Sequence, residues 1–273
     1  MVIAKSSSAK RSHAQPRGRG RPSAGGMVVQ GGGMSRALIL ERALELARRL
    51  PLADLSMAEL AKDLGVTPAL IYYYLSDRDT LVSGVVNLFY KALVHSWPEP
   101  SGAWRADMAA LAHAMHANDL HYAGVSRYLA THNRFRLFQR VQEGETDYGL
   151  EYFNRAAQIL QSGGFTPEQA TLAYHLLMQH VATSGGAQAL HLLPADHKDY
   201  IRSRLKAAPI ERYGGAHFLA DAFPELSAAQ AFEAGLELLL NGVEAWLPTV
   251  TKVKAAKVKA VKATAAPKKS SRR

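Results

Sequence analysis

The sequence contains no cysteine, which excludes disulfides, thiolate metal ligands and cysteine nucleophiles. No apolar run approaches the roughly 18 residues that a membrane-spanning helix requires, and the basic N-terminus lacks the apolar segment of a secretory signal. The serine-hydrolase elbow, the P-loop, the H-E-x-x-H motif and the Gly-rich dinucleotide fingerprint are also missing. These absences predict a cytoplasmic protein with no membrane partner, no cofactor and no enzymatic activity.

Charge is distributed unevenly along the 273 residues, whose net charge is +10. Residues 1–34 contain six Lys and Arg and residues 248–273 contain nine, and neither segment contains an acid. Residues 35–247 hold the remaining 18 basic and 23 acidic side chains, a net charge of −5. The two basic segments are expected to be disordered, and they indicate a polyanion partner, most simply nucleic acid.

Each basic segment has its own pattern. Arg19-Gly20-Arg21-Pro22 resembles the core of an AT-hook, a peptide thin enough for the minor groove of A·T tracts. An arm that contacts only phosphates explains the same residues. The Lys-Ala repeat of the second segment resembles the tails of linker-histone-like and nucleoid-associated proteins, although a tail that only keeps the protein soluble has the same composition.

The stretch 56–75, SMAELAKDLGVTPALIYYYL, predicts two short helices around a tight turn. Ser56 begins a capping box, and Gly65 suits the left-handed conformation that ends a helix. Thr67 is a favourable N-cap for the second helix, with Pro68 at its first position. This spacing is typical of a helix-turn-helix motif, although a plain helical hairpin has the same pattern.

The second helix of this stretch has an apolar inward face, formed by Ile71, Tyr74 and Leu75. In a helix-turn-helix the opposite face lies in the DNA major groove. The outward residues are Thr67, Pro68, Ala69, Tyr72 and Tyr73.

The wider span 35–95 resembles the N-terminal domain of the TetR family of bacterial transcriptional regulators. The pattern LxxALELA…LSMAELAKDLGVTPALIYYYLSDRDTL matches the family's first helix, its capped second helix, its turn and third helix, and the opening of its fourth helix. The resemblance implies an all-α chain, with an N-terminal three-helix DNA-binding domain and a C-terminal helical domain for ligand binding and dimerisation. The DNA contacts it implies are base contacts by Thr67, Ala69, Tyr72 and Tyr73, a phosphate contact by Ser56, and a clamp on the DNA backbone by Arg78.

The predicted DNA-reading helix departs from the family at two inward positions, with Leu75 where Phe is usual and Tyr74 where His is common. Its outward face has no Arg, Lys, Asn or Gln, so it cannot form bidentate hydrogen bonds to G or A edges. Pro68 and Ala69 can still contact thymine methyl groups. The span 35–95 has seven basic and seven acidic residues, so we expect the basic segments at both chain ends to supply phosphate contacts.

The pattern from 96 to 247 stays helical, which predicts a single effector-binding and dimerisation domain. Pro194, Pro209, Gly214-Gly215 and Pro224 predict a loop-rich connection over 189–226, with a short helix at 196–207. Helices of the whole chain are expected at 35–50, 56–64, 67–75, 77–96 with Ser76 as its cap, 101–117, 119–131, 134–162, 166–184 and 227–247.

The segment 223–247, FPELSAAQAFEAGLELLLNGVEAWL, resembles the C-terminal segment of the tetracycline-repressor branch of the same family. The resemblance implies that helices 166–184 and 227–247 pair with their copies in a second subunit as a four-helix bundle. Two half-sites on DNA also require two recognition helices related by a dyad. Alternatively, these apolar stripes serve only the core of one subunit.

The middle helices are expected to enclose an effector pocket, and the acidic body suits a cationic or a neutral hydrophobic effector. For each candidate alone, an ordinary core aromatic or surface histidine is the alternative. His113 and His116 share a helix face near His121, but no carboxylate lies at helical spacing beside both, so no metal site is predicted. The pocket candidates are His113, His116, Tyr122, Phe135, Phe138, Tyr148, Tyr152, Tyr174, His175 and Met178.

Together these features predict a sequence-specific transcriptional regulator that binds double-stranded DNA as a homodimer. We expect a repressor that a small-molecule effector releases from its operator. The alternative is a nucleoid-associated protein that binds DNA mainly through its basic tails. Both functions place the protein in the cytoplasm, at the nucleoid.

Overall fold

The computed structural model describes residues 33–132 and 137–247, which form helices joined by turns and contain no strand. The basic segments with Arg19 and Arg21, and the pocket candidate Phe135, lie outside these described residues. The first helices are α1 (Arg36–Leu46), α2 (Met57–Leu64), α3 (Pro68–Tyr74) and α4 (Arg78–Ser96). The body adds α5 (Trp104–His121), α6 (Ala123–Thr131), α7 (Tyr148–Ser162), α8 (Pro167–Ala189) and α11 (Ala228–Glu244). Between α8 and α11 lie η1 (Pro194–His197), α9 (Lys198–Ala207), α10 (Ile210–Leu219) and η2 (Phe223–Glu225). This architecture confirms the all-α prediction.

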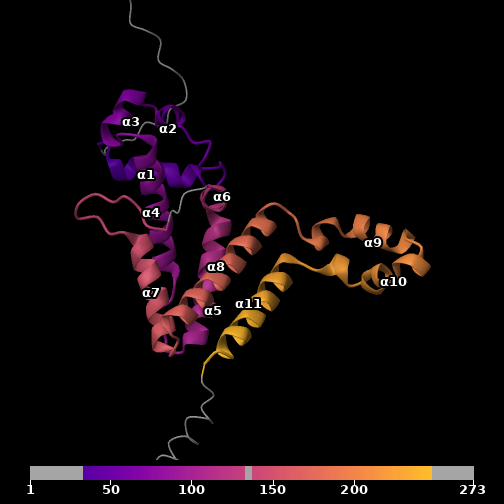
Figure 1. Ribbon diagram of the computed structural model, residues 1–273. Coiled ribbons are helices and arrows are strands. Elements are labelled where there is room, and N and C mark those ends of the chain that lie inside the picture. Colours follow the sequence, from indigo (N-terminus) through magenta and orange to yellow (C-terminus); the bar gives the residue numbers. More distant parts are fainter. Residues whose placement is uncertain (1–32, 133–136, 248–273) are drawn as a thin grey trace, which may run out of the picture.

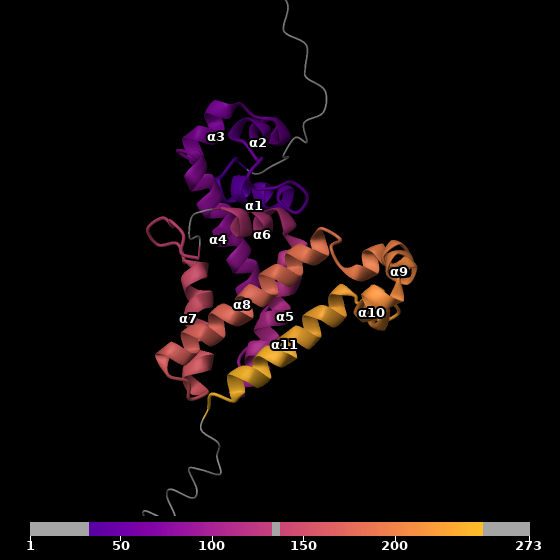
Figure 2. The same ribbon diagram turned by 45° about the vertical axis from the view of Figure 1, so that its right-hand side comes forward.

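The helices separate into a small N-terminal group and a larger body (Figures 1 and 2). Helices α1, α2 and α3 lie at one end, and α4 runs from them into the body, where it packs against α7 and α5. Helices α8 and α11 lie side by side and both contact α5. Helix α4 is therefore the element that the two groups share. None of the helices in the described ranges combines the length and apolar character needed to cross a membrane.

The N-terminal group is held by an apolar core and one bidentate ion pair. The faces of α1 and α2 that meet consist of buried aliphatic side chains, including Ile39, Leu40 and Leu60. Beside them Arg42 Nε and Nη2 donate to the two carboxylate oxygens of Asp63 at 2.6 and 2.9 Å. These hydrogen bonds lower the pKa of Asp63, so the pair stays charged at neutral pH.

Residues 190–226, called the arm below, stand away from the body (Figures 1 and 2). The arm is closed at its base by a hydrogen bond of 3.2 Å from Ala195 N to Leu226 O. Neither α9 nor α10 contains a buried residue. Ion pairs link its helices, with Lys206 Nζ 2.7 Å from Asp221 Oδ1 and Lys198 Nζ 3.2 Å from Glu225 Oε2. The large apolar side chains that the arm exposes are Leu190, Leu192, Tyr200, Ile210, Tyr213, Phe218, Leu219, Phe223 and Leu226.

The prediction of one long helix over 134–162 is wrong, because α7 begins only at Tyr148. Gly144 adopts a left-handed φ of 82° in the preceding turn, and the Asp147 carboxylate accepts from Leu150 N at 3.0 Å as an N-cap. A Cβ at Gly149 would lie 1.9 Å from Leu137 O, so the incoming chain packs directly on the start of the helix. The described residues before α7, 137–147, therefore contain no helix.

The prediction of a loop-rich connection over 189–226 is also wrong. Helix α8 continues to Ala189 instead of ending at residue 184, and the arm contains α9 and α10. Pro209 is the N-cap of α10 and Pro224 lies in η2, so prolines that suggested loops mark helix starts. The short helix predicted at 196–207 is present as α9.

Several predicted helix ends, and one predicted N-cap, need smaller corrections. Helix α1 ends at Leu46 rather than residue 50, and helices α5 and α6 begin at 104 and 123 rather than 101 and 119. The cap of α4 is Asp77, whose carboxylate accepts from Thr80 N at 2.7 Å, instead of Ser76.

Candidate DNA-binding face and ligand cavity

The turn between α2 and α3 is built by local hydrogen bonds that the sequence predicts. Glu59 N donates to Ser56 Oγ at 3.1 Å, and Ser56 N donates to Glu59 Oε2 at 2.9 Å, which is the predicted capping box. The same contacts lower the pKa of Glu59. Gly65 ends α2 with a φ of 70°, a conformation that side-chain-bearing residues adopt at a cost. The turn therefore fixes the direction in which α3 leaves.

Helix α3 presents one buried and one exposed face. Ile71 and the following Leu75 are fully buried, whereas Tyr72 and Tyr73 are 53% and 80% exposed. The exposed face contains all five residues predicted to face outward: Thr67, Pro68, Ala69, Tyr72 and Tyr73. Thr67 has the extended backbone of an N-cap, but its side chain makes no capping hydrogen bond. This face carries no charge, so it can contact bases through methyl, ring and hydroxyl groups only.

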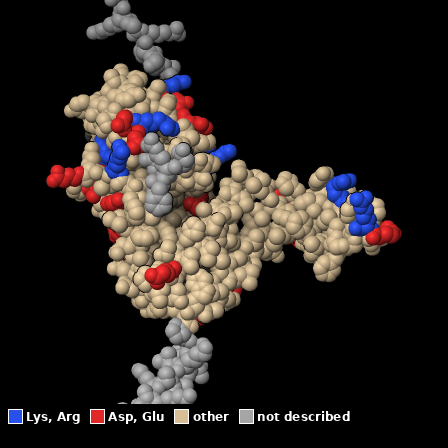
Figure 3. Space-filling model, viewed as in Figure 1, with Lys and Arg blue, Asp and Glu red and all other residues tan. Residues whose placement is uncertain are grey.

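The remaining two predicted DNA contacts lie at the ends of α2 and α4. Ser56 is half-buried because it serves the capping box, whereas Arg78 is exposed. Arg78 Nη2 donates to the carbonyls of Leu52 and Ala53, which ties the start of α4 to the α1–α2 connection. Figure 3 shows that the charged side chains on the visible face gather over the N-terminal helices and at the tip of the arm.

A cavity of about 560 Å³ lies among the helices of the body, beside the connection that follows α1. Its walls come from this connection and from α4, α5, α6, α7 and α8. The volume is in the range of sites that hold small organic ligands. Aromatic, methionine and small side chains form most of the lining, and the polar groups include one carboxylate, from Asp119.

Three predicted pocket residues, Tyr152, Tyr174 and Met178, line this cavity. Their side chains form a chain of contacts, in which Tyr174 Oη donates to Tyr152 Oη at 3.1 Å and Tyr152 Oη donates to Met178 Sδ at 3.0 Å. Burial raises the pKa of both tyrosines. The phenols are therefore neutral at physiological pH.

The other described candidates lie elsewhere. His113 and His116 face α11, where His113 Nε2 is 2.9 Å from Glu233 Oε1 and the His116 ring stacks on Phe232 at 4.1 Å. Neither histidine lines this cavity, because α5 turns a different face toward it. Four more candidates do not line the cavity: Tyr122, Phe138, Tyr148 and His175. Tyr122 packs on Phe89, and Tyr148 packs on His95. Phe138 is 47% exposed and packs on Phe153, and His175 is exposed.

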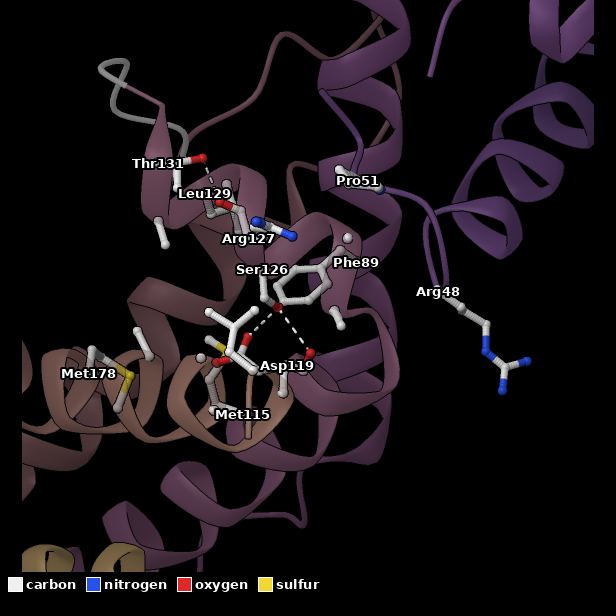
Figure 4. A pocket seen from close by; sticks show the side chains of 18 of the residues that line it. Arg48, Pro51, Phe89, Met115, Asp119, Ser126, Arg127, Leu129, Thr131 and Met178 are labelled. Carbon is white, nitrogen blue, oxygen red and sulfur yellow. Dashed lines mark hydrogen bonds between the residues drawn. The ribbon is translucent and has the colours of Figure 1, made fainter. Parts of the chain in front are cut away.

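Among the lining residues that were not predicted from the sequence, the one carboxylate is Asp119 on α5 (Figure 4). Only 9% of its surface is exposed, and Ser126 Oγ on α6 donates to its Oδ1 at 2.8 Å. Burial raises the pKa of this carboxyl to about 6, and the Ser126 hydrogen bond opposes the shift. A signal was present in the sequence, because Leu111, Met115 and Asp119 follow at four-residue intervals and place one acid in an apolar stripe.

The cavity wall is joined directly to the N-terminal helices. Gly124, at the start of α6, donates its N–H to Ala47 O at 3.0 Å and accepts from Leu52 N at 3.1 Å. A Cβ at Gly124 would lie 2.0 Å from Leu50 O, so only glycine permits this approach. The connection that Gly124 contacts is the one that Arg78 contacts from α4. We call these contacts of Gly124 and Arg78 with residues 47–53 the junction.

Residues 33–132 and 137–247 contain no cluster of three His, Cys, Asp or Glu side chains that could hold a metal ion. Within these residues His113 and His116 are engaged by groups on α11 instead of facing a common centre. Their contacts are those of packed helix surfaces.

Comparisons with known proteins agree with this arrangement. The sequence profile described as bacterial regulatory proteins, tetR family, matches residues 39–85, and the profile described as tetracyclin repressor-like, C-terminal domain, matches residues 98–247. Apo ActR from Streptomyces coelicolor has a similar fold, with a TM-score of 0.66 and 23% identity over 79% of this chain and 97% of that chain. ActR in complex with actinorhodin gives a TM-score of 0.61 and 23% identity over 78% and 98%. TetR from Acinetobacter baumannii AYE gives a TM-score of 0.55 and 22% identity, over 78% of this chain and 97% of that chain. No curated protein sequence gives a significant match.

Proposed function

The chain belongs to the TetR family of bacterial regulatory proteins, and we propose that it is a homodimeric repressor that a small molecule releases from a palindromic operator. As a member of this family it is a transcriptional regulator with a helix-turn-helix DNA-binding domain and a ligand-binding C-terminal domain, and the family is not one of enzymes. The operator, the sign of regulation and the release mechanism are the parts proposed here.

The surface proposed to contact the DNA bases is the exposed face of α3. Its hydroxyls on Thr67, Tyr72 and Tyr73 offer hydrogen bonds to bases or phosphates, and Pro68 and Ala69 offer apolar contact to thymine methyl groups. Because this face lacks bidentate donors, we expect an operator whose half-sites are rich in A·T pairs. Ser56 and Arg78 are proposed to contact the flanking phosphates through the start of α2 and through the guanidinium N–H groups that the protein carbonyls leave open.

The basic segments 1–34 and 248–273 are proposed to supply most of the phosphate neutralisation, with Arg19 and Arg21 reaching the minor groove. A DNA-binding domain with balanced charge gains little from counterion release on its own. Deleting both segments is expected to weaken binding and to reduce its dependence on salt, while the preferred operator sequence stays the same. An unchanged salt slope would contradict this assignment.

The proposed dimer forms through α8 and α11. The outer face of α11 carries the exposed apolar or small residues Ala234, Leu238 and Gly242 at four-residue spacing. The side chain of Leu238 is 72% exposed. On α8 Leu172 is 54% exposed. Leaving such a face in water is unfavourable, and a dyad along it would set two copies of α3 for two half-sites.

The observation that carries the proposal is the junction. The helix α6, which lines the cavity, is hydrogen-bonded through Gly124 to the residues that follow α1. Any ligand that favours a shifted α6 therefore also favours a shifted DNA-binding domain, and the spacing of two recognition helices changes. A ligand releases the operator only to the extent that it binds the shifted arrangement more tightly.

The proposal can be tested without knowledge of the operator. The intact protein is used to select bound sequences from a random DNA pool, and we expect two inverted half-sites separated by about one helical turn. Length-proportional binding with no enriched sequence would contradict the proposal and would favour a nucleoid-associated protein. The light-scattering mass of the free protein is expected to be that of a dimer, and Leu238→Lys is expected to reduce it to that of a monomer.

A further inference from the structure

The cavity contains a buried carboxylate with one unused oxygen. The Oδ1 of Asp119 accepts from Ser126, whereas no described residue donates to Oδ2. Gly185 of α8 lies opposite, where a Cβ would be 3.6 Å from Oδ2, so the absence of a side chain there keeps this oxygen clear. Oδ2 is therefore a free acceptor on an otherwise apolar wall (Figure 4).

No cation of the described residues forms an ion pair with Asp119. The arginines around the cavity, at positions 48, 49 and 127, are exposed at its rim, and Arg48 points away from it toward Glu45, with Nη1 2.9 Å from Glu45 Oε1. Exposed charges are screened by water and salt, whereas a buried charge is not. The dominant charge inside the cavity is negative.

A buried carboxylate without a counter-ion is costly, and proteins usually pair it. Most of the side chains that line the cavity with Asp119 are aromatic or apolar, among them Tyr90, Tyr152 and Phe89. Tyr90 and Tyr152 stack on each other with ring centroids 5.4 Å apart. Aromatic faces attract cations, so this wall and the carboxylate favour the same kind of ligand.

We propose that the cavity binds a ligand with one protonated nitrogen on an apolar, ring-containing body, and that Asp119 is the counter-ion of that nitrogen. The cation lies between Asp119 Oδ2 and the faces of the neighbouring aromatic rings, and the apolar body fills the space toward Met115 and Met178. This assignment rests on the proposed function in one respect, because it takes the cavity as the effector site.

A purely structural role for Asp119 is the competing explanation. Its carboxylate accepts from Ser126 near the start of α6, and this contact could be its only purpose. Asp119→Asn separates the two roles, because the amide oxygen still accepts from Ser126 while the negative charge is removed. A matched control is Glu143→Gln, which removes the same charge from an exposed loop position outside the cavity.

The test uses three probes of one shape, namely 2-naphthylmethylammonium, 2-naphthylmethanol and 2-naphthoate. At about pH 7.5 they are positive, neutral and negative, respectively, and Asp119 is ionised. Binding to the full-length protein is measured by calorimetry without DNA. We expect the wild type to prefer the cation, and Asp119→Asn to weaken cation binding about 10- to 100-fold. Binding of the neutral alcohol should stay within about twofold in both variants, and Glu143→Gln should behave as wild type.

Three results would overturn the assignment. They are equal affinity for all three probes, no binding of the cation to wild type, and a cation affinity that Asp119→Asn leaves unchanged while the variant keeps the wild-type circular dichroism spectrum. Preference for 2-naphthoate would contradict the assignment as well, because it would identify the rim arginines as the ligand's partners. Because DNA is absent from these measurements, their failure leaves the operator selection intact, and a failed selection leaves the cation site intact.

Discussion

The DNA-binding face and the ligand cavity are built in opposite ways. The face comes from one stretch of 20 residues, 56–75, whose capping box, glycine turn and apolar stripe are all local. The cavity takes its lining from residues between Arg48 and Leu190, on five helices and the connection that follows α1. A site made by neighbouring residues has its geometry set by short-range rules, whereas a site made by distant helices depends on how those helices pack. The two sites should therefore respond to mutation independently, except at the junction.

The largest expected effect separates the two sites. Tyr72→Ala together with Tyr73→Ala should weaken binding to the selected operator by about 100-fold or more, because two base-contacting groups are lost. Probe binding in the cavity should not change. Tyr200→Ala is the matched control, since Tyr200 is 71% exposed on the arm and far from α3 in sequence and fold. Gel-shift titration measures operator affinity, and wild-type affinity in the double variant would contradict the assignment of α3.

The second prediction concerns the place where the two sites meet. Gly124→Ala places a methyl group against Leu50 O and Ala47 O, so the backbone must move. We expect a loss of stability of about 1–3 kcal/mol and weaker coupling between cavity and operator. Thermal unfolding measures the loss of stability. The coupling is measured as the ratio of the operator affinities with and without a ligand bound in the cavity. Gly214→Ala on α10 meets nothing within 4 Å and is the control.

The third prediction concerns the free energy of folding that is lost by burying the ionised carboxylate of Asp119 in the cavity. The folded-state pKa of Asp119, about 6, lies above its ordinary value of 3.8, so the folded protein binds a proton more readily than the unfolded chain. The contribution of Asp119 to stability should therefore rise as pH falls from about 7 to about 4. Removing the charge with Asp119→Asn should stabilise the ligand-free protein by about 2 kcal/mol at neutral pH and should flatten this slope. The tyrosines beside it stay neutral over this range, because burial raises their pKa values.

Urea unfolding at several pH values measures the free energy of unfolding for this comparison. A destabilised Asp119→Asn variant at neutral pH would show that the carboxylate is needed for folding. The same variant therefore links stability to ligand choice: it should be more stable than wild type and less able to bind a cation.

The smallest expected effect lies within the DNA-binding face itself. Both Ser56 and Thr67 are helix N-caps by sequence, but only Ser56 makes the capping hydrogen bond. Ser56→Ala should reduce stability by about 1 kcal/mol, whereas Thr67→Ala should change it by less than about 0.5 kcal/mol. The free energies come from urea unfolding of both variants. Equal losses would show that Thr67 also caps α3 in solution.

The same contrast explains which features were predictable. Ser56, Gly65 and Ile71 have conformations that short-range hydrogen bonding and helical period determine, and the prediction of this motif is confirmed. The pocket candidates were selected by residue type. Of these, Tyr152, Tyr174 and Met178 line the cavity, whereas His113 and His116 lie on the face of α5 that meets α11. Which face of α5 meets α11 and which meets the cavity depends on the crossing of helices far apart in sequence.

Asp119 shows a second limit of residue-type reasoning. An acid does not belong to the usual composition of an apolar pocket, so a search for aromatic and histidine residues passes over it. Its four-residue spacing from Met115 was the available signal. The described residues 137–147 show a third limit, because they contain no helix where one was predicted, and α7 starts only at the N-cap Asp147.

The arm has a consequence for how assembly could be followed in solution. Two helices without a buried residue have almost no apolar burial to hold them, so in a lone subunit their backbone amides should exchange with deuterated solvent nearly as fast as in an unfolded peptide. Contact with another subunit would slow that exchange. Exchange at residues 198–219, measured by mass spectrometry on the unlabelled, unmutated chain, would therefore show whether the exposed apolar side chains of the arm contact another subunit.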